Sequence, residues 1–214
     1  MHSGFERNAA DLVAEVSRRE VEPGRPLVGD IASALQRRGW RREIAGDDFD
    51  AAAYAAAKAF VNGRGLLVGG AFGSGKTALV DALTKATVLG RTTLKVNLGD
   101  PEDAERLDSR IWPNWNAGAL ERNVFLDDLG SESIVSEYGS FREAAGDFIV
   151  RYHAKGRGLL FLTTNLGPKE LEARYTMRVM SRILDRTVPL VLHGADKRTI
   201  MTAERPAGQE GGAE

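Results

Sequence analysis

One eight-residue stretch combines glycines, a lysine and a hydroxyl group at a spacing suited to phosphate binding. It runs from Gly70 to Thr77, reads Gly-Ala-Phe-Gly-Ser-Gly-Lys-Thr, and matches the pattern G-x-x-x-x-G-K-[S/T] at every fixed position. Glycines let backbone N–H groups approach a polyphosphate closely, and a helix starting at the loop points its positive end at the anion. Lys76 would pair with the β- and γ-phosphates of ATP, and the Thr77 hydroxyl would join a Mg²⁺ shell. The expected cofactor-binding residues are Gly70, Gly73, Ser74, Gly75, Lys76, Thr77 and Ala78.

Two carboxylates follow an apolar run elsewhere in the chain. Val124-Phe125-Leu126 has the composition of a buried strand and leads directly into Asp127 and Asp128. A phosphate-binding loop needs an acidic group at the end of a neighbouring strand to hold magnesium. We therefore expect Asp127 to hold Mg²⁺ through water, and Asp128 to orient or deprotonate an attacking water. The alternative is a strand that simply ends in a polar turn.

A polar side chain follows another apolar run, Leu159 to Thr163. Asn165 lies just past the end of that run, where it could reach the γ-phosphate or the attacking water in a sheet that carries the other two motifs. The competing interpretation is an asparagine that caps the chain before Pro168. Local sequence leaves both open.

Arginine recurs every four residues near the carboxyl end of the sequence, at Arg174, Arg178, Arg182 and Arg186. A continuous helix would align these side chains on one side. They would then form either a solvated face or an arginine presented to the nucleotide of a neighbouring subunit, where it stabilises transition-state charge. The spacing alone does not choose between these two interpretations.

The elements that position these residues alternate between short apolar strands and helices, which is typical of a parallel sheet. The expected fold class is α/β, a P-loop NTPase with a parallel five-stranded sheet flanked by helices. Proline in the last strand suggests that this strand is at the sheet edge. The strands are expected at 66–68, 93–97, 124–126, 159–163 and 188–192, and the helices at 50–61, 77–89, from about 101, and at 141–153.

The amino-terminal region precedes the loop as a small helical appendage. Apolar periodicity predicts a helix over 5–20, and a second helix is expected from Asp30, as its N-cap, to about Arg38. The segment 41–46 reads as a linker or turn. The chain is thus expected to divide into three parts: a short helical region at 1–45 that would dock on the core or on a partner, a core at 46–204, and a disordered tail at 205–214.

The composition excludes several classes of function. The 214 residues carry a formal net charge of -1 and no cysteine, which removes disulfides, zinc knuckles and thiol catalysis. Any nucleic-acid surface must then be a local patch. No apolar stretch approaches the roughly 18–20 residues needed to span a bilayer. We expect a cytoplasmic protein without a membrane partner.

Taken in order, the motifs resemble those of the DnaC/IstB-type AAA+ ATPases, which include helicase loaders and the ATP-binding subunits of some transposons. The resemblance covers about 66–198. Its more specific part is Thr-Thr-Asn-Leu at 163–166, followed by Arg-Val-Met-Ser-Arg at 178–182. It implies an AAA+ (ASCE) core with little or no lid domain.

The resemblance also implies roles and partners. Asn165 would be the sensor residue, and Arg182 the arginine acting in trans, with Arg178 beside it in role. The implied activity is ATP hydrolysis that drives assembly into a homo-oligomer through ATP-bridged interfaces, single-stranded DNA contact and loading of a replicative DNA helicase. The candidates for DNA contact are Lys155, Arg157, Arg174 and Lys197.

Other functions remain open from sequence alone. An IstB-like transposition helper would bind duplex DNA, and a small-molecule P-loop kinase would transfer the phosphate to an acceptor instead of water. A module that binds nucleotide without hydrolysis is disfavoured by the intact Lys76, Thr77, Asp127 and Asp128. The ranges 98–122 and 131–140 receive no assignment.

Overall fold

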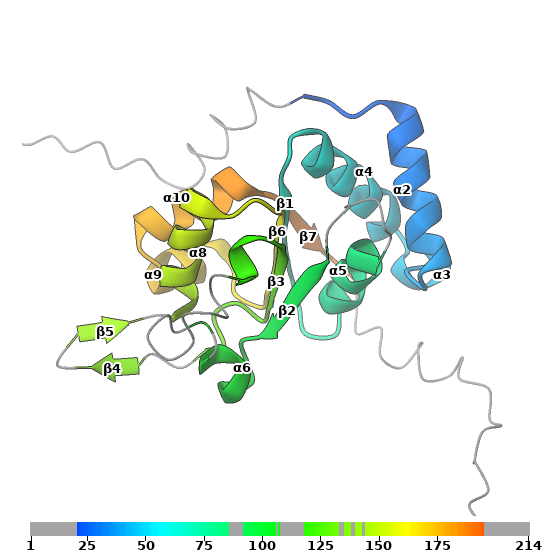
Figure 1. Cartoon of the computed structure of the whole chain (residues 1–214). Coiled ribbons are helices and arrows are strands. Elements are labelled where there is room, and N and C mark those ends of the chain that lie inside the picture. The colour runs from blue at the N-terminus through cyan, green and yellow to red at the C-terminus, as the bar shows by residue number, and fades with distance from the viewer. Residues whose placement is uncertain are drawn as a thin grey trace, which may run out of the picture.

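The computed structural model describes residues 21–85, 92–105, 107, 118–132, 135–137, 140–142 and 144–194. Five parallel strands form one sheet in the order β2-β3-β6-β1-β7 (Figure 1). The strands are β1 (Gly65–Gly70), β2 (Thr93–Asn97), β3 (Asn123–Asp127), β6 (Leu160–Thr164) and β7 (Thr187–Leu192). All five expected strands are present, and the predicted fold class is confirmed.

Helices cover both faces of this sheet (Figure 1). On one face lie α2 (Arg25–Arg37), α4 (Asp48–Val61) and α5 (Lys76–Lys85), and on the other lie α8 (Ala144–Lys155), α9 (Pro168–Arg174) and α10 (Met177–Arg186). Every residue of the central strands β3 and β6 is buried, as expected of parallel strands covered on both sides. Successive residues of a strand face opposite sides, so Leu66 and Val68 pack under α4 and α5, while Leu67 packs towards α9 and α10.

The edge position expected for the last strand is also observed. β7 pairs with β1 along one side, and among the described strands it has no second neighbour. Pro189 and Val191 are both exposed on it. A proline is tolerated there because its missing N–H removes no hydrogen bond from a central ladder.

The amino-terminal segment packs directly on the sheet domain. Ile31 and Leu35 of α2, and Trp40 after it, belong to the same buried cluster as strand β1. Two local expectations were wrong here. α2 starts at Arg25, with Gly24 as N-cap, so Asp30 lies inside the helix. The expected linker 41–46 contains a short helix, α3 (Arg42–Ala45), whose Ile44 and Ala45 are buried.

Two carboxyl-terminal expectations also differ from the structure. The helix expected at 141–153 begins only at Ala144, because the preceding residues form a two-stranded hairpin, β4 (Val135–Glu137) with β5 (Ser140–Arg142). The continuous helix that would align the four arginines is not present, because the chain is interrupted between α9 and α10. There Tyr175 and Thr176 are extended, and the Thr176 hydroxyl accepts a hydrogen bond from the Val179 N–H. The four side chains therefore do not form one row.

The remaining predictions fall partly outside the described residues. α5 confirms the predicted helix as far as Lys85, and α6 (Pro101–Glu105) confirms the start near 101. The expected helix 5–20, the tail 205–214 and the candidate contact Lys197 are outside the described part of the chain. Among the described residues, no helix has the length and apolar character needed to cross a membrane.

A buried carboxylate ties the start of α4 to the end of β7. Asp48 is 6% exposed and accepts hydrogen bonds from the backbone N–H groups of His193 and Gly194, both at 3.0 Å. We expect Asp48→Ala to lower the free energy of unfolding by about 2 kcal/mol, because both N–H groups lose a charged acceptor. Asp47→Ala is the matched control, since Asp47 is exposed and makes no capping hydrogen bond. Urea unfolding of the two variants measures the difference, and equal midpoints would contradict the assignment.

Candidate functional site

The expected site residues come together at the carboxyl ends of three neighbouring strands, β3, β6 and β1. The phosphate-binding loop follows β1 and leads into α5, Asp127 ends β3, and Asn165 follows β6. Ligands of open α/β sheets bind at this edge. Strand order therefore explains why motifs far apart in the sequence lie side by side.

Backbone conformation explains the glycines of the loop. Gly73 and Gly75 have φ angles of 78° and 91°, which side chains with a Cβ rarely adopt. Gly70 has φ 147°, and a Cβ there would lie 2.6 Å from the Leu192 carbonyl oxygen and 2.9 Å from Ser74 Oγ. Ser74 itself is fully buried, and its hydroxyl finds no hydrogen-bond partner among the described residues. A compact loop with this backbone leaves room only for glycine at Gly70.

Lys76 connects the loop to the strand beside it. Its side chain is largely buried, and Nζ donates to the carbonyl oxygens of Gly70 and Ala71, both at 2.9 Å. A third hydrogen bond, of 2.7 Å, reaches Asn165 Oδ1. The ammonium thus lies between the loop backbone and the residue expected to act as sensor.

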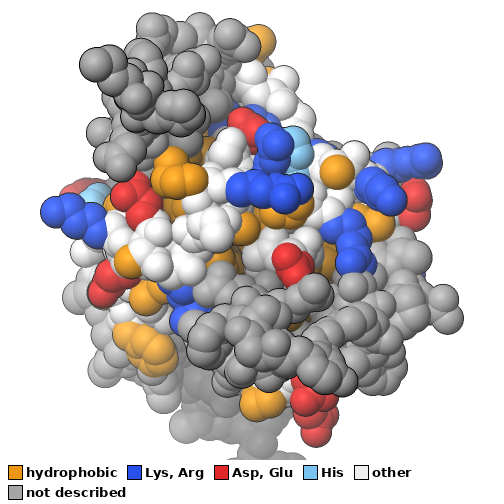
Figure 2. Space-filling model, turned by 90° about the vertical axis from the view of Figure 1, so that its left-hand side faces the viewer, with side chains coloured by type: hydrophobic (Ala, Val, Ile, Leu, Met, Phe, Trp, Pro, Cys, Tyr) orange, Lys and Arg blue, Asp and Glu red, His pale blue; other side chains and the backbone are white. Residues whose placement is uncertain are grey.

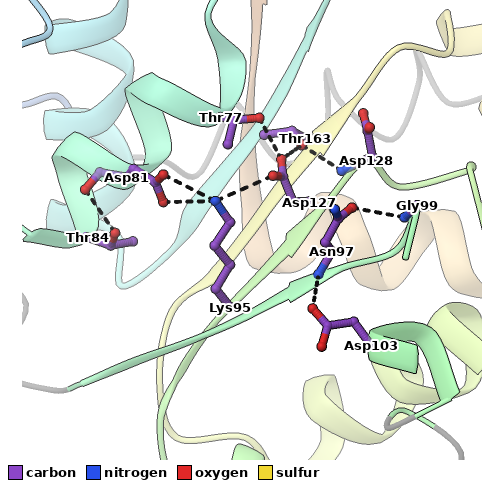
Figure 3. Close-up of polar contacts among 10 residues, drawn as sticks. All are labelled: Thr77, Asp81, Thr84, Lys95, Asn97, Gly99, Asp103, Asp127, Asp128 and Thr163. Atoms are coloured by element: carbon purple, nitrogen blue, oxygen red, sulfur yellow. Dashed lines mark hydrogen bonds and ion pairs between the residues drawn. The ribbon is translucent and has the colours of Figure 1, made fainter. Parts of the chain in front are cut away.

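The carboxylate of Asp127 joins the three elements of the site (Figure 3). Its Oδ1 accepts hydrogen bonds from the Thr77 hydroxyl at 2.9 Å and from the buried Thr163 hydroxyl at 2.6 Å. Thr163 Oγ1 accepts in turn from the Asp128 N–H at 2.9 Å. The predicted metal ligands Thr77 and Asp127 are therefore in direct contact.

Asp128 is held in an uncommon backbone conformation beside them. Its φ angle is 62°, and among the described residues it is the one non-glycine residue with positive φ. Its Oδ1 accepts a 2.8 Å hydrogen bond from Asn165 Nδ2. Lys76, Asn165 and Asp128 thus form a continuous hydrogen-bonded chain. Asn165 faces these groups, so the interpretation as a simple cap before Pro168 does not describe its contacts.

A charged residue that the sequence analysis missed also contacts this carboxylate. Lys95 Nζ lies 3.6 Å from Asp127 Oδ2 and 3.2 Å from Asp81 Oδ2 (Figure 3). It also lies 4.9 Å from the centre of the Phe125 ring. Lys95 stands opposite Phe125 in the parallel β2–β3 pair. The only signal in the sequence was a lysine within an apolar strand, and its meaning depends on which strand is adjacent.

A pocket of about 220 Å³ lies above the loop. Its lining combines the polar residues Lys76, Thr77, Asp128 and Asn165 with apolar ones. Two of the apolar residues, Trp40 and Ile44, come from the amino-terminal segment and were not predicted. The lining residues are Trp40, Ile44, Phe72, Gly73, Gly75, Lys76, Thr77, Ala78, Asp128 and Asn165.

The chemistry of this pocket fits a magnesium nucleotide. Hydroxyl and carboxylate oxygens, as on Thr77 and Asp127, are the ligands Mg²⁺ prefers, and it commonly uses few protein groups plus phosphate and water. Among the described residues, no cluster of three or more His, Asp or Glu side chains could hold a metal by itself. The first N–H groups of α5 have no acceptor within the helix, as at any helix start, and suit phosphate oxygens.

The structure does not bring the arginines into this pocket. Arg178 and Arg182 lie on α10, on the sheet face opposite α5; Arg178 is exposed, and Arg182 pairs with Asp185 at 3.4 Å. Burial and then the nearby charge of Arg182 lower the pKa of His153. The described pocket lining includes neither arginine.

The other two arginines have structural contacts. Arg186 donates to three carbonyl oxygens at the end of α8, those of Tyr152, His153 and Gly156, which satisfies acceptors that a helix end leaves open. Arg174 contacts Glu132, and its expected contact with DNA stays a prediction. On the side of the molecule drawn in Figure 2, Lys and Arg side chains form several separate groups with Asp and Glu between them.

Comparison with known structures shows what this fold is similar to. Two solved structures have a similar fold. The DnaC helicase loader shares 24% identity with the chain, with a TM-score of 0.51 over 61% of this chain and 79% of that one. The replication initiator DnaA bound to AMPPCP and single-stranded DNA shares 16% identity, with a TM-score of 0.52 over 72% of this chain and 49% of that one.

A third structure, described as a candidate primosome component from Streptococcus pyogenes serotype M3, has 23% identity and a TM-score of 0.49 over 63% of this chain and 70% of its own. No protein-family model and no curated protein sequence matches the chain. At the level of the fold, the resemblance to DnaC-type AAA+ proteins is confirmed by the helicase loader structure.

Proposed function

We propose that the protein is an ATP-hydrolysing AAA+ switch. The observation that carries this proposal is the connected set of polar contacts from Lys76 through Asn165 to Asp128, next to the Thr77–Asp127 pair. This set combines a phosphate-binding cation, a pair of metal ligands and a candidate general base at one edge of the sheet. Hydrolysis needs all three.

Each side chain has a distinct role in this proposal. The loop and Lys76 bind the β- and γ-phosphates, and Thr77 and Asp127 hold Mg²⁺. A Mg²⁺ held there would neutralise the charge that develops on the phosphates. Asp128 orients the attacking water and accepts its proton, and Asn165 fixes the Asp128 carboxylate by the observed hydrogen bond. Thr163 keeps Asp127 in place through its buried hydroxyl.

The apolar half of the pocket suits the base of the nucleotide. Trp40, Ile44, Phe72 and Ala78 line it, and a mainly apolar wall with a few polar groups is typical of small-ligand sites. The amino-terminal region is then part of the nucleotide site. We retain the proposal that this region also docks a partner, with 46–204 as the ATPase core and the cytoplasm as the location.

Hydrolysis is proposed to require a second subunit. Arg182, with Arg178 beside it, lies on the face of the sheet opposite α5, and its side chain retains 39% exposure. In an ATP-bridged homo-oligomer, this guanidinium would stabilise the transition-state charge in the neighbouring pocket. Helicase loading with single-stranded DNA contact is the proposed use of the switch, supported by the motif order and by the fold shared with the DnaC helicase loader.

The first test concerns the phosphate contact. Lys76→Ala should reduce ATP turnover at least about 100-fold, because it removes a preorganised charge from the transferred phosphate. Phosphate release measures the turnover, and Lys85→Ala, an exposed lysine at the end of the same helix, is the matched control. Normal turnover in Lys76→Ala would refute the proposal.

The second test concerns the subunit interface. Arg182→Ala should lose at least about 100-fold in turnover while keeping its affinity for ATP, since the arginine acts only on the neighbour's transition state. Addition of inactive Asp128→Asn subunits should partly restore turnover, because each variant supplies the group that the other lacks. Arg37→Ala, exposed on α2, controls for loss of a surface charge. Absence of rescue would remove Arg182 from the site.

The third test concerns the nucleic acid. ATP-dependent binding to single-stranded and duplex DNA is compared by fluorescence anisotropy at one salt concentration, since phosphate contacts make affinity depend strongly on salt. We expect single-stranded DNA to bind at least about tenfold more tightly. A duplex preference would instead favour the transposition helper. No ATP-dependent binding to either would contradict both DNA-linked functions.

A further inference from the structure

Glu132 is a buried carboxylate that the proposed hydrolysis does not use. It is 4% exposed and ends the segment that begins at Asp128. Its Oε2 accepts a 2.8 Å hydrogen bond from the Gly130 N–H, and its Oε1 accepts one from the Tyr175 hydroxyl. A buried carboxylate is costly unless its oxygens are satisfied, so these contacts hold the segment in one conformation.

Arg174 adds a second connection between the same two parts of the chain. Its guanidinium donates to the Glu132 carbonyl oxygen and lies 3.9 Å from Glu132 Oε1 and 5.9 Å from the centre of the Tyr175 ring. Arg174 is the last residue of α9, and Tyr175 immediately precedes Thr176, the N-cap of α10. Glu132 is thus attached at the junction between the two helices.

The other end of the segment 128–132 is attached to the nucleotide pocket. Asp128 accepts from Asn165, and the Ser131 hydroxyl donates to the Asp128 carbonyl oxygen at 2.5 Å. Both backbone groups of Leu129 form hydrogen bonds with β6. Its N–H donates to the Thr163 carbonyl oxygen at 2.7 Å, and its carbonyl oxygen accepts from the Thr164 hydroxyl at 2.8 Å.

The middle of the segment has no free space around it. Gly130 has φ 98°, and a Cβ on it would lie 2.4 Å from Leu166 Cδ1 and 3.6 Å from Arg174 Cδ. The segment is therefore packed directly between the residues that follow β6 and the end of α9. Asp128, at one end of the segment, is held by Thr163 and Asn165, whereas Glu132, at the other end, contacts Tyr175 at the α9–α10 junction.

We propose that Glu132 is a positioning residue that fixes the orientation of α10, and with it Arg178 and Arg182, relative to the nucleotide pocket of its own subunit. It acts through Tyr175 and Arg174 and touches neither nucleotide nor metal. This inference rests on the proposed role of Arg182 in a neighbouring subunit. It also says which pocket each residue affects. Glu132 acts on hydrolysis in the neighbouring subunit's pocket, whereas Asp128, at the other end of the same segment, acts in the pocket of its own subunit.

The test separates these two roles by mixing subunits. Arg182→Ala subunits can accept an arginine but not provide one, and Asp128→Asn subunits can provide one but not hydrolyse. Glu132→Gln, which keeps the size of the side chain, is added to each in turn. We expect Asp128→Asn/Glu132→Gln to rescue Arg182→Ala about tenfold less well than Asp128→Asn alone, because a small misplacement of a catalytic group is costly. Arg182→Ala/Glu132→Gln should still be rescued by Asp128→Asn to within about twofold.

The controls separate failure of this inference from failure of the proposed function. Glu121→Gln, a change of the same type in an exposed pair with Arg157, should leave both rescues unchanged. If Arg182→Ala and Asp128→Asn do not rescue each other, the proposed function itself fails. If they do, three results would each overturn the positioning role. Rescue could be weakened equally by Glu132→Gln in either subunit, it could be weakened only when the accepting Arg182→Ala subunit carries this change, or it could stay unchanged in both mixtures. Thermal unfolding of each variant confirms that the mixed subunits are folded.

Discussion

One carboxylate oxygen, Oδ1 of Asp127, connects the three elements on which the site depends. Asp127 ends β3, its partner Thr163 lies on the adjacent β6, and its partner Thr77 lies in the first turn of α5, which follows β1 through the loop. Hydrogen bonds to an ionised acceptor are stronger than neutral ones, and this oxygen is largely shielded from water. This single atom therefore links the end of β3, strand β6 and the start of α5.

The sheet separates the two halves of the proposed chemistry. Nucleotide contacts gather at the start of α5, with the amino-terminal segment against one face, whereas α8, α9 and α10 lie on the other (Figure 1). The central strands have side chains committed to both cores, so neither layer can slide without disturbing the other. The segment 128–132 runs from the pocket to the layer of α8, α9 and α10. It has polar contacts at both ends, at Asp128 and at Glu132.

The sequence was most informative where one local pattern determines the outcome. Continuous apolar runs predicted the buried strands β3 and β6, because parallel strands covered on both faces contain little else, and the loop spacing predicted Lys76 and Thr77. It was least informative where the outcome depends on neighbours in space. Lys95 gains meaning only from the β2–β3 pairing, and Trp40 only from packing beside the loop. The four-residue spacing of the arginines does not reveal that Thr176 caps a new helix, so it does not show that the four side chains are not aligned on one helix.

The place of Trp40 and Ile44 in the pocket wall has a thermodynamic consequence. These residues follow α2 directly, and the expected boundary between the amino-terminal region and the core at residue 45 runs through the pocket itself. Any macromolecule that grips α2 and prefers one arrangement of this wall must change the affinity for nucleotide. By reciprocity, the nucleotide must then change the affinity for that macromolecule by the same factor. In this chain, capture and release of a binding partner would need no transmission across the sheet. The residues that follow the partner-binding helix α2 are themselves part of the pocket lining.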